Sequence, residues 1–325
     1  MSPRTCFAVG GSPSTRFSTS AAEVRGCPGA GVGTRVAQAG MSTVDPSVPL
    51  VGLFETAFYQ FAPEPMMRYA VPDSWHDIGV RRWGFHGASH KFIAERSAEL
   101  LGRKDIARRA ANLYVDGGKS PVGGAPLRVI SCHLGGSSSI TGIFNGVAIG
   151  NSLGMSPQSG LPHNNRVGDF DPFAIPVIMK ATGLSLDEVL HQLAEKSGLL
   201  GLSGVSGDIR DLEEAAAAGN ARARLALDVF AAEIRRHLGG VLAELGGADV
   251  IVFTGGIGEN ALHVRSAVLG NLQGLGIELD PQANASAKGE CCVSKPGSRT
   301  QIWIVPTNEE LVVARQTVEL LSKKT

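Results

Sequence analysis

The feature that most constrains this chain is a strand that runs directly into a glycine-rich turn and then a helix. Residues 252–260, VFTGGIGEN, place three glycines within four positions after a short apolar run. Glycines at such a junction let the backbone approach a ligand closely at the N-terminus of a helix. The spacing is neither the GxGxxG dinucleotide pattern nor a P-loop. Judged alone, the segment could equally be a tight strand-to-helix turn without a ligand.

Strand and helix patterns alternate through the second half of the chain, which predicts an α/β fold. Strands are expected at 127–132, 140–150, 248–253 and 302–306, and Asn145-Gly146 indicates a hairpin inside the second. Helices are expected over 88–101, 184–198, 219–246, 261–272 and 307–321. Ser185 with Glu188, and Thr307 with Glu310, have capping-box spacing, and Gly198 suits a helix stop.

Length, charge and cysteine content exclude few functions but indicate what class of protein this is. The 325 residues suffice for two modest domains, and 30 basic residues balance 30 acidic ones, so charge gives no argument for nucleic acid or membrane partners. Five cysteines without metal-site or disulfide spacing indicate reduced thiols in a cytoplasmic protein. Residues 1–48, rich in Ser, Gly and Ala, favour a disordered or non-native leader over a transit peptide.

Two polar segments could meet a phosphate. Residues 133–139, HLGGSSS, offer backbone N–H groups and hydroxyls at one turn, although a plain β-turn has the same composition. Residues 84–90, GFHGASH, carry His86 and His90 four positions apart. Zinc is disfavoured because no third ligand lies nearby, whereas a histidine can donate to a phosphoryl group in transfer or simply cap a turn.

Three further segments keep two interpretations each. Arg166 in NNRVGDFDP could form a loop ion pair or clamp a carboxylate or phosphoryl group. Asp208 and Arg210 in SGVSGDIRD could recognise a nucleotide, but a helix cap is favoured from this segment alone. Glu55 in FETAF lies either at a solvent-facing strand edge or in a cleft.

Taken together, seven segments in order resemble the acetate and propionate kinase family: FETAFYQFAP, RRWGFHGASH, HLGGSSSITGI, GMSPQSGLPHNNRVGDFDP, LSGVSGDIRD, VFTGGIGENA and PTNEELVVAR. The resemblance implies an actin-like ATPase (ribonuclease-H-like) fold with two domains. The N-terminal domain would be incomplete, because no NAGSSS-type or HRVVHGG-type segment is found. Residues 49–127 would be its remnant and 128–325 the C-terminal nucleotide-binding domain, whose last helix would pack back on the first domain.

The resemblance also implies an activity, namely reversible transfer of a phosphoryl group from ATP, with Mg²⁺, to a short-chain carboxylate. Acetate is the first expectation and propionate the second, and a homodimer is expected. Two alternatives stay open. One is a truncated homologue that binds nucleotide with little or no kinase activity, and the other is a non-catalytic interaction protein.

Residue roles follow from the same resemblance. His86 and Arg166 would stabilise the phosphoryl group in flight, and Glu55 stands where the family usually has Asp. Glu309 would help to hold Mg²⁺ through water. Phe85 and Pro157 would line the pocket for the small alkyl group. The nucleotide would contact His133, Gly135, Gly136, Ser137, Asp208, Ile209, Arg210, Gly256, Ile257 and Asn260.

Overall fold

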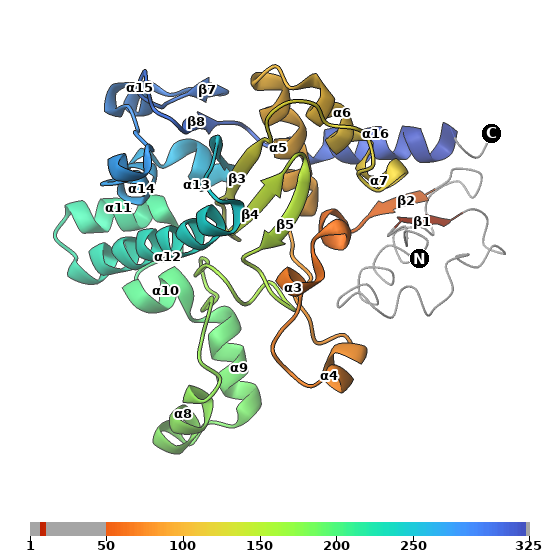
Figure 1. The fold of residues 1–325 in the computed structure, drawn as a ribbon. Coiled ribbons are helices and arrows are strands. Elements are labelled where there is room, and N and C mark those ends of the chain that lie inside the picture. The colour runs from red at the N-terminus through yellow and green to blue at the C-terminus, as the bar shows by residue number, and fades with distance from the viewer. Residues whose placement is uncertain (1–6, 11–49, 323–325) are drawn as a thin grey trace.

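The computed structural model describes residues 7–10 and 50–322 and is built around a six-stranded mixed sheet (Figure 1). Its strands run in the order β5-β4-β3-β6-β8-β7. Strands β3, β6 and β8 are parallel, whereas β4, β5 and β7 pair antiparallel with their neighbours. Their bounds are β3 Arg128–His133, β4 Ser139–Phe144, β5 Val147–Asn151, β6 Val250–Thr254, β7 Cys291–Cys292 and β8 Gln301–Ile304.

Helices bury both faces of this sheet. Residues alternate between the faces, so that Ile130 packs towards one group of helices and Val129 towards the other. The first group includes α10 (Gly198–Ser203), α11 (Ile209–Ala217), α12 (Ala221–Leu245) and α14 (Leu262–Leu269). The second includes η2 (Ala57–Phe61), α5 (Gly87–Leu100), α6 (Lys104–Ala111) and α7 (Leu113–Asp116).

Other helices of the described residues complete the fold. They are α3 (Glu64–Met67), α4 (Asp73–Asp77), α8 (Ala174–Thr182), α9 (Leu186–Glu195), α13 (Gly255–Asn260), η3 (Gln273–Leu275), α15 (Pro281–Ser286) and α16 (Glu309–Ser322). Helices α8 and α9 project away from the sheet (Figure 1). Across the described residues, no helix combines the length and the apolar character needed to cross a bilayer.

The last helix, α16, returns to pack against α5. The Thr307 hydroxyl, just before α16, donates to Ser89 Oγ at 2.8 Å, and Arg315 Nη1 bonds Glu95 Oε2 at 2.9 Å. Glu95 also pairs with the fully buried ammonium group of Lys91. These contacts place the N-terminal ends of both helices at the same end of the sheet. The domain boundaries expected from the sequence stay a prediction.

A short strand precedes the globular part. Strand β1 (Phe7–Gly10) pairs antiparallel with β2 (Leu50–Leu53), with Phe7 opposite Leu53. The sequence pattern did not predict a strand there, because only four residues take part. The remainder of the predicted leader over 1–48 lies outside the described residues.

Most local signals in the sequence form as expected. The hairpin between β4 and β5 turns at Asn145 and Gly146, whose φ values of 50° and 80° match a two-residue type I′ loop. The capping box of Ser185 and Glu188 starts α9. The helix expected over 219–246 forms as α12, with Ala223 buried and Leu225 exposed near its start.

Two predicted helix ends are wrong. Helix α9 ends at Glu195, and Gly198 begins α10. A Cβ at Gly198 would lie 2.2 Å from the carbonyl oxygen of His163, so a close backbone approach explains this glycine. Thr307 does not cap α16, since its hydroxyl is engaged by Ser89. The Asn308 side chain instead accepts the N–H of Leu311.

The buried pair of Lys91 and Glu95 yields a stability prediction. Glu95→Gln should lower the free energy of unfolding by about 3 kcal/mol, because it leaves the Lys91 ammonium group buried without its carboxylate. Urea denaturation measures this change. As a control, Arg68→Ala breaks only the exposed pairs with Glu64 and Asp73 and should cost about 0–1 kcal/mol. A similarly small loss in Glu95→Gln would contradict the account.

Candidate active site

Two histidine rings stack at the carboxyl end of β3. His133 is the last residue of β3 and His86 immediately precedes α5, and their ring centroids lie 4.3 Å apart at an interplanar angle of 25°. His86 has a left-handed backbone conformation with φ of 56°, which is uncommon for a residue other than glycine. Strain of this kind persists only where surrounding contacts impose it.

Glu55 supplies those contacts. Its carboxylate Oε2 accepts the main-chain N–H of His86 at 2.7 Å, and its carbonyl oxygen accepts the N–H of Gly87 at 2.9 Å. A Cβ at position 87 would lie 2.2 Å from that carbonyl oxygen, so only glycine allows the approach. The Glu55 side chain is therefore directed at the start of α5 and close to His86. Its catalytic role stays a prediction.

Serine hydroxyls form hydrogen bonds with the ring nitrogens of the site histidines. Ser139 Oγ lies 2.8 Å from His86 Nδ1 and also 2.8 Å from Nε2 of the fully buried His90. Ser131 Oγ lies 2.8 Å from His90 Nδ1, and Ser89 Oγ lies 2.8 Å from His133 Nδ1. Sequence reasoning did not assign Ser89 or Ser131 to the site, and it counted Ser139 among the turn hydroxyls that could meet a phosphate, whereas Ser139 is buried against the histidines. The available signal was their position inside or beside the GFHGASH and HLGGSSS segments.

The histidines are uncharged near neutral pH. Burial first, and then the nearby His133, His163 and Arg166, lower the pKa of His86 to about 3. Burial lowers the pKa of His133 to about 4, and burial together with Arg166 lowers that of His163 to about 4. Neutral imidazoles can donate one hydrogen bond each without repelling Arg166.

Arg166 joins three parts of the site. Its Nη1 donates to Ser137 Oγ at 3.3 Å and to the carbonyl oxygen of Pro157 at 3.4 Å. Its charge also acts on His86 and His163. The structure thus brings Ser137 of the HLGGSSS segment together with Arg166 and Pro157, which belong to one other segment of the sequence.

The two glycine-rich turns form one continuous backbone surface. Leu134 N–H donates to the carbonyl oxygen of Thr254 at 2.8 Å, and the Leu134 carbonyl oxygen accepts the N–H groups of Ile257 at 2.9 Å and Gly258 at 3.1 Å. Gly255 is required here, since its φ is 78° and a Cβ would lie 2.7 Å from the Leu134 oxygen. The residues predicted to lie near the nucleotide phosphates are on the first of these turns, namely His133, Gly135, Gly136 and Ser137, and Gly256 and Ile257, predicted for the adenosine side, are on the second.

The predicted adenosine-side residues make local contacts in the structure. Asp208 caps α11 by accepting the N–H of Arg210, whose guanidinium group also pairs with the Asp208 carboxylate. Ile209 is buried in the core, and Asn260 donates to the carbonyl oxygen of Gly256 at 2.9 Å. The helix-capping interpretation of Asp208 is therefore confirmed, and the nucleotide contacts stay a prediction.

Two carboxylates provide the oxygen ligands that a hard cation prefers. Glu309 is the first residue of α16, and burial together with the nearby Glu55 raises its pKa. The charge of Glu55 therefore acts on the Glu309 carboxylate. Oxygen donors with open positions for water and phosphate fit Mg²⁺. Within residues 7–10 and 50–322, no group of three or more His, Cys, Asp or Glu has metal-ligating geometry.

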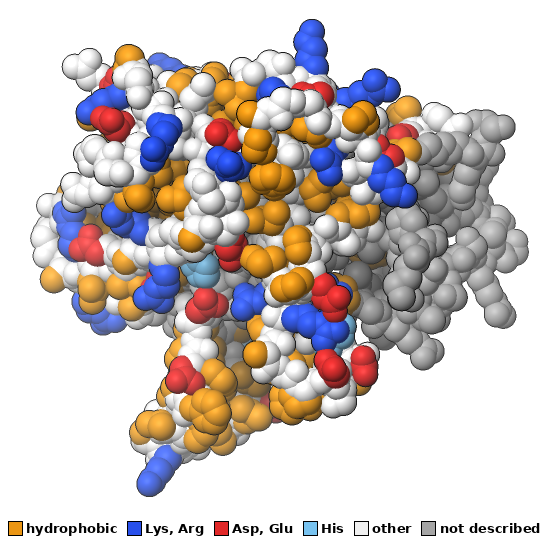
Figure 2. Space-filling view, in the orientation of Figure 1, with side chains coloured by type: hydrophobic (Ala, Val, Ile, Leu, Met, Phe, Trp, Pro, Cys, Tyr) orange, Lys and Arg blue, Asp and Glu red, His pale blue; other side chains and the backbone are white. Residues whose placement is uncertain are grey.

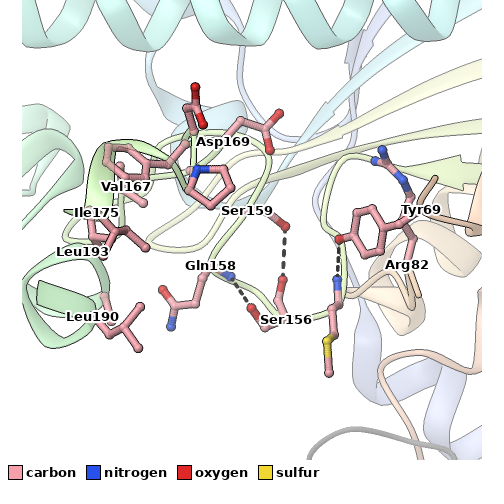
Figure 3. Close-up of a pocket in the computed structure, with 16 residues that line it drawn as sticks. Tyr69, Arg82, Ser156, Gln158, Ser159, Val167, Asp169, Ile175, Leu190 and Leu193 are labelled. Atoms are coloured by element: carbon pink, nitrogen blue, oxygen red, sulfur yellow. Dashed lines mark hydrogen bonds between the residues drawn. The ribbon is translucent and has the colours of Figure 1, made fainter. Parts of the chain in front are cut away.

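A cavity of about 870 Å³ is lined in part by Ser156 and Gln158, the residues on either side of Pro157 in the chain. Tyr69 and Arg82 border one side, and apolar residues of α9, including Leu190 and Leu193, border the other (Figure 3). Tyr69 Oη accepts the N–H of Met155 at 3.0 Å, which holds the loop in place. The lining includes none of the predicted site residues, so the cavity is a neighbour of the site.

The lowered pKa values predict how the histidines titrate. His86 and His133 should show no protonation by NMR between about pH 7.5 and 5, whereas an unfolded histidine titrates near 6.5. The unfolded chain then binds protons first, so the free energy of unfolding should fall as the pH drops from about 6.5 towards 4. A His86 midpoint near 6.5 would contradict this electrostatic description.

Known proteins resemble this chain over most of its length. The model of the acetokinase family matches residues 34–315. The chain is 44% identical over 276 residues to the acetate kinase of Geobacillus sp. (strain WCH70), covering 85% of this chain and 65% of that protein. It is 45% identical over 281 residues to the acetate kinase of Dictyoglomus thermophilum, covering 86% and 65%. The chain thus spans slightly less than two thirds of these relatives.

Solved structures of acetate and propionate kinases also resemble this chain. The crystal structure of Porphyromonas gingivalis acetate kinase matches with a TM-score of 0.77 and 38% identity, covering 87% of this chain and 67% of that one. A propionate kinase from Francisella tularensis matches with a TM-score of 0.74 and 32% identity, covering 89% and 68%. These matches confirm the predicted α/β, actin-like fold class. Motifs, fold and relatives agree, and the chain belongs to the acetokinase family.

Proposed function

We propose that this chain catalyses the reversible transfer of a phosphoryl group from ATP to a short-chain carboxylate, with acetate yielding acetyl phosphate. The observation that carries the proposal is the meeting of His86, His133 and Arg166 beside the two interlocked glycine-rich turns. One cation and two neutral donors at one point suit a group whose negative charge is spread over several oxygens.

The glycine-rich turns would hold the phosphates of ATP. Among the described residues, the N–H groups of Gly136 and Ser137 donate to no protein acceptor and are free to meet a ligand. Arg166 is anchored on the same turn through Ser137. A phosphate bound here would lie next to His133, and the stacked His86 ring would be within reach of the terminal phosphoryl group.

The acceptor carboxylate would enter on the side of Arg166. Pro157 is held against Arg166 through its carbonyl oxygen, and Phe85 directly precedes His86 in the chain. Tyr59 Oη donates to the Phe85 carbonyl oxygen at 2.7 Å, which fixes this part of the wall. A wall of proline and phenylalanine suits a small alkyl group. The relatives named above are acetate and propionate kinases, and acetate is our first assignment and propionate our second.

Glu309, on whose carboxylate the charge of Glu55 acts, would hold Mg²⁺ through water. The ion would bind together with ATP, because two carboxylates alone leave most of its six positions unfilled. When bound, it neutralises charge on the phosphate oxygens. The protein's own contribution is to keep Glu309 in place through the contact between Thr307 and Ser89, two residues before α16 begins.

A hydroxamate assay with ATP, Mg²⁺ and acetate tests the activity directly. Acyl phosphate formation at a rate proportional to enzyme supports the proposal. Two failures are distinguishable by a nucleotide titration of the same preparation. ATP binding without product would favour the nucleotide-binding homologue of low activity, and absence of ATP binding would favour a non-catalytic interaction protein.

Arg166→Ala should lower kcat by about a hundredfold to a thousandfold, because it removes the cation that faces the phosphoryl group. Arg166→Lys should recover little, since a single ammonium group cannot reproduce the planar fork of donors. Arg68→Ala, which alters only a surface ion-pair network, is the matched control and should keep ordinary turnover. Turnover of Arg166→Ala within tenfold of the parent would contradict the assigned role.

We also propose that the chain forms a homodimer through the projecting pair α8 and α9. Phe173 and Val177 are 82% and 67% exposed, and Figure 2 shows hydrophobic side chains gathered over this projection. Apolar surface of this kind is typical of subunit contacts. The free cysteines Cys132, Cys291 and Cys292 support a cytoplasmic, reducing location for such a dimer.

Val177→Asp should convert the dimer to a monomer, because it places a charge in the proposed contact. Analytical ultracentrifugation measures the change. Val318→Asp is the matched control, since Val318 is 65% exposed on α16, remote from α8 in sequence and in the fold. A parent chain that sediments as a monomer at micromolar concentration would overturn the proposal, as would a dimeric Val177→Asp variant.

A further inference from the structure

A chain of hydrogen bonds runs from the interior of the sheet to His86. It begins at Ser131 Oγ, passes through both nitrogens of the His90 ring to Ser139 Oγ, and ends at His86 Nδ1, with every step 2.8 Å long. Ser131, His90 and Ser139 are all fully buried. Water therefore does not compete for these groups, and their protons must be shared among themselves.

Proton counting allows the chain only two directions. Each serine hydroxyl donates one hydrogen, and each neutral imidazole carries one N–H and one acceptor nitrogen. If Ser131 donates to His90, then His90 Nε2–H donates to Ser139, and Ser139 donates to His86 Nδ1. In the opposite direction every bond reverses, and His86 carries its proton on Nδ1. The direction at Ser131 thus fixes the tautomer at His86.

The surroundings of Ser131 favour one of the two directions of the hydrogen-bond chain. Among the described residues, its hydroxyl has His90 as its single hydrogen-bond partner. If the chain ran outward from His86, the Ser131 hydroxyl would accept from His90 and its own proton would be buried without an acceptor. An orphaned buried donor costs about 1–3 kcal/mol. The inward end of the chain is therefore the donor, and His86 holds its proton on Nε2.

A second, separate chain acts on His133. The Thr307 hydroxyl donates to Ser89 Oγ, so Ser89 directs its own proton to His133 Nδ1. His133 then carries its proton on Nε2 as well, beside the glycine-rich turn at Gly135. The two stacked rings thus receive the same tautomer from two independent hydrogen-bond chains.

We infer that Ser131, His90 and Ser139 are positioning residues that fix His86 in its Nε2–H tautomer, so that a neutral ring donates a hydrogen bond outward to an anionic ligand. Ser89 and Thr307 do the same for His133. The catalytic consequence rests on the proposed function, but the tautomer itself does not. A neutral histidine with the proton on the wrong nitrogen would present a lone pair to the phosphoryl oxygens and repel them.

Nitrogen NMR of the full, ¹⁵N-histidine-labelled chain at neutral pH tests the inference without any activity. The chain contains an internal reference, because His163 Nδ1 accepts the main-chain N–H of Ser138 at 2.8 Å, and an amide can only donate. His163 is thereby an Nε2–H tautomer. His86 and His133 should show the same pattern, with the pyridine-like shift on Nδ1. A pyridine-like Nε2 on His86 would overturn the inference.

The Ser131→Ala variant tests whether Ser131 acts on His86 through the hydrogen-bond chain or only contributes to packing. Ser131 is three hydrogen bonds away from His86, yet removing its hydroxyl removes the bias, so both His86 nitrogens should shift towards each other as tautomers mix. Ser131→Thr should restore the parent pattern. Ser152→Ala is the matched control, since Ser152 is a buried serine whose hydroxyl bonds Ile140 N–H and no histidine. Unchanged His86 shifts in folded Ser131→Ala would overturn the inference.

Kinetics give a second readout. In Ser131→Ala, kcat should fall about twofold at unchanged KM for ATP, because about half of the molecules would hold the proton on the wrong nitrogen. A shift in tautomer without any change in kcat would support the hydrogen-bond chain and count against the role of His86 in phosphoryl transfer. If Ser131→Ala does not fold, the tautomer of the parent chain and the Ser131→Thr variant still decide the question.

Discussion

The stacking of His86 on His133 in a buried site is the constraint on which the rest of the structure depends. Two imidazoles can lie 4.3 Å apart beside Arg166 only while both are uncharged, and burial lowers both pKa values far enough to ensure this. The site therefore needs no counter-anion before a ligand arrives. Because both rings are largely buried, each hydrogen bond to an incoming phosphate acts in a lower local dielectric and is strengthened.

The fold can be understood as the scaffold for that stack. Parallel pairing of β3 with β6 brings His133 opposite Thr254, so the two glycine-rich turns leave the sheet at the same edge. Leu134 then locks the turns together. Helix α5 delivers His86, and its packing against α16 brings Glu309 to the same place. Strain at His86 is balanced by Glu55, which holds both the residue and the following glycine.

Local parts of this arrangement were predictable from the sequence. Buried strands, the Asn145-Gly146 hairpin and the Ser185 capping box depend on neighbours within a few residues, and they formed as expected. Family motifs also located His86, His133 and Arg166 at one site. At the start of α16, Thr307 and Asn308 could each have capped the helix, and a contact with a distant residue determined which of them does. Thr307 was engaged by Ser89, 218 positions away, and the adjacent Asn308 became the cap.

The hydrogen-bond chains behind the histidines could not be predicted in the same way. Ser139 and His90 are 49 positions apart, and Ser131 and His90 are 41 apart. Serines in turns and strands are common, so composition gave no reason to select these. Only the register of β3 against β4, which sets His133 opposite Ser139, together with the docking of α5, makes the contacts. Similarly, the exposed residues of α8 and α9 became meaningful once the helices were seen to project from the sheet.

A crystal structure of the chain with Mg²⁺ and a non-hydrolysable ATP analogue tests the central claim most directly. The account predicts that the terminal phosphate lies on the turns around Gly136 and Gly256, with His86 Nε2 and His133 Nε2 within hydrogen-bond distance of its oxygens. It also predicts Glu309 beside the metal. A triphosphate bound elsewhere, with neither histidine ring facing it, would contradict the account.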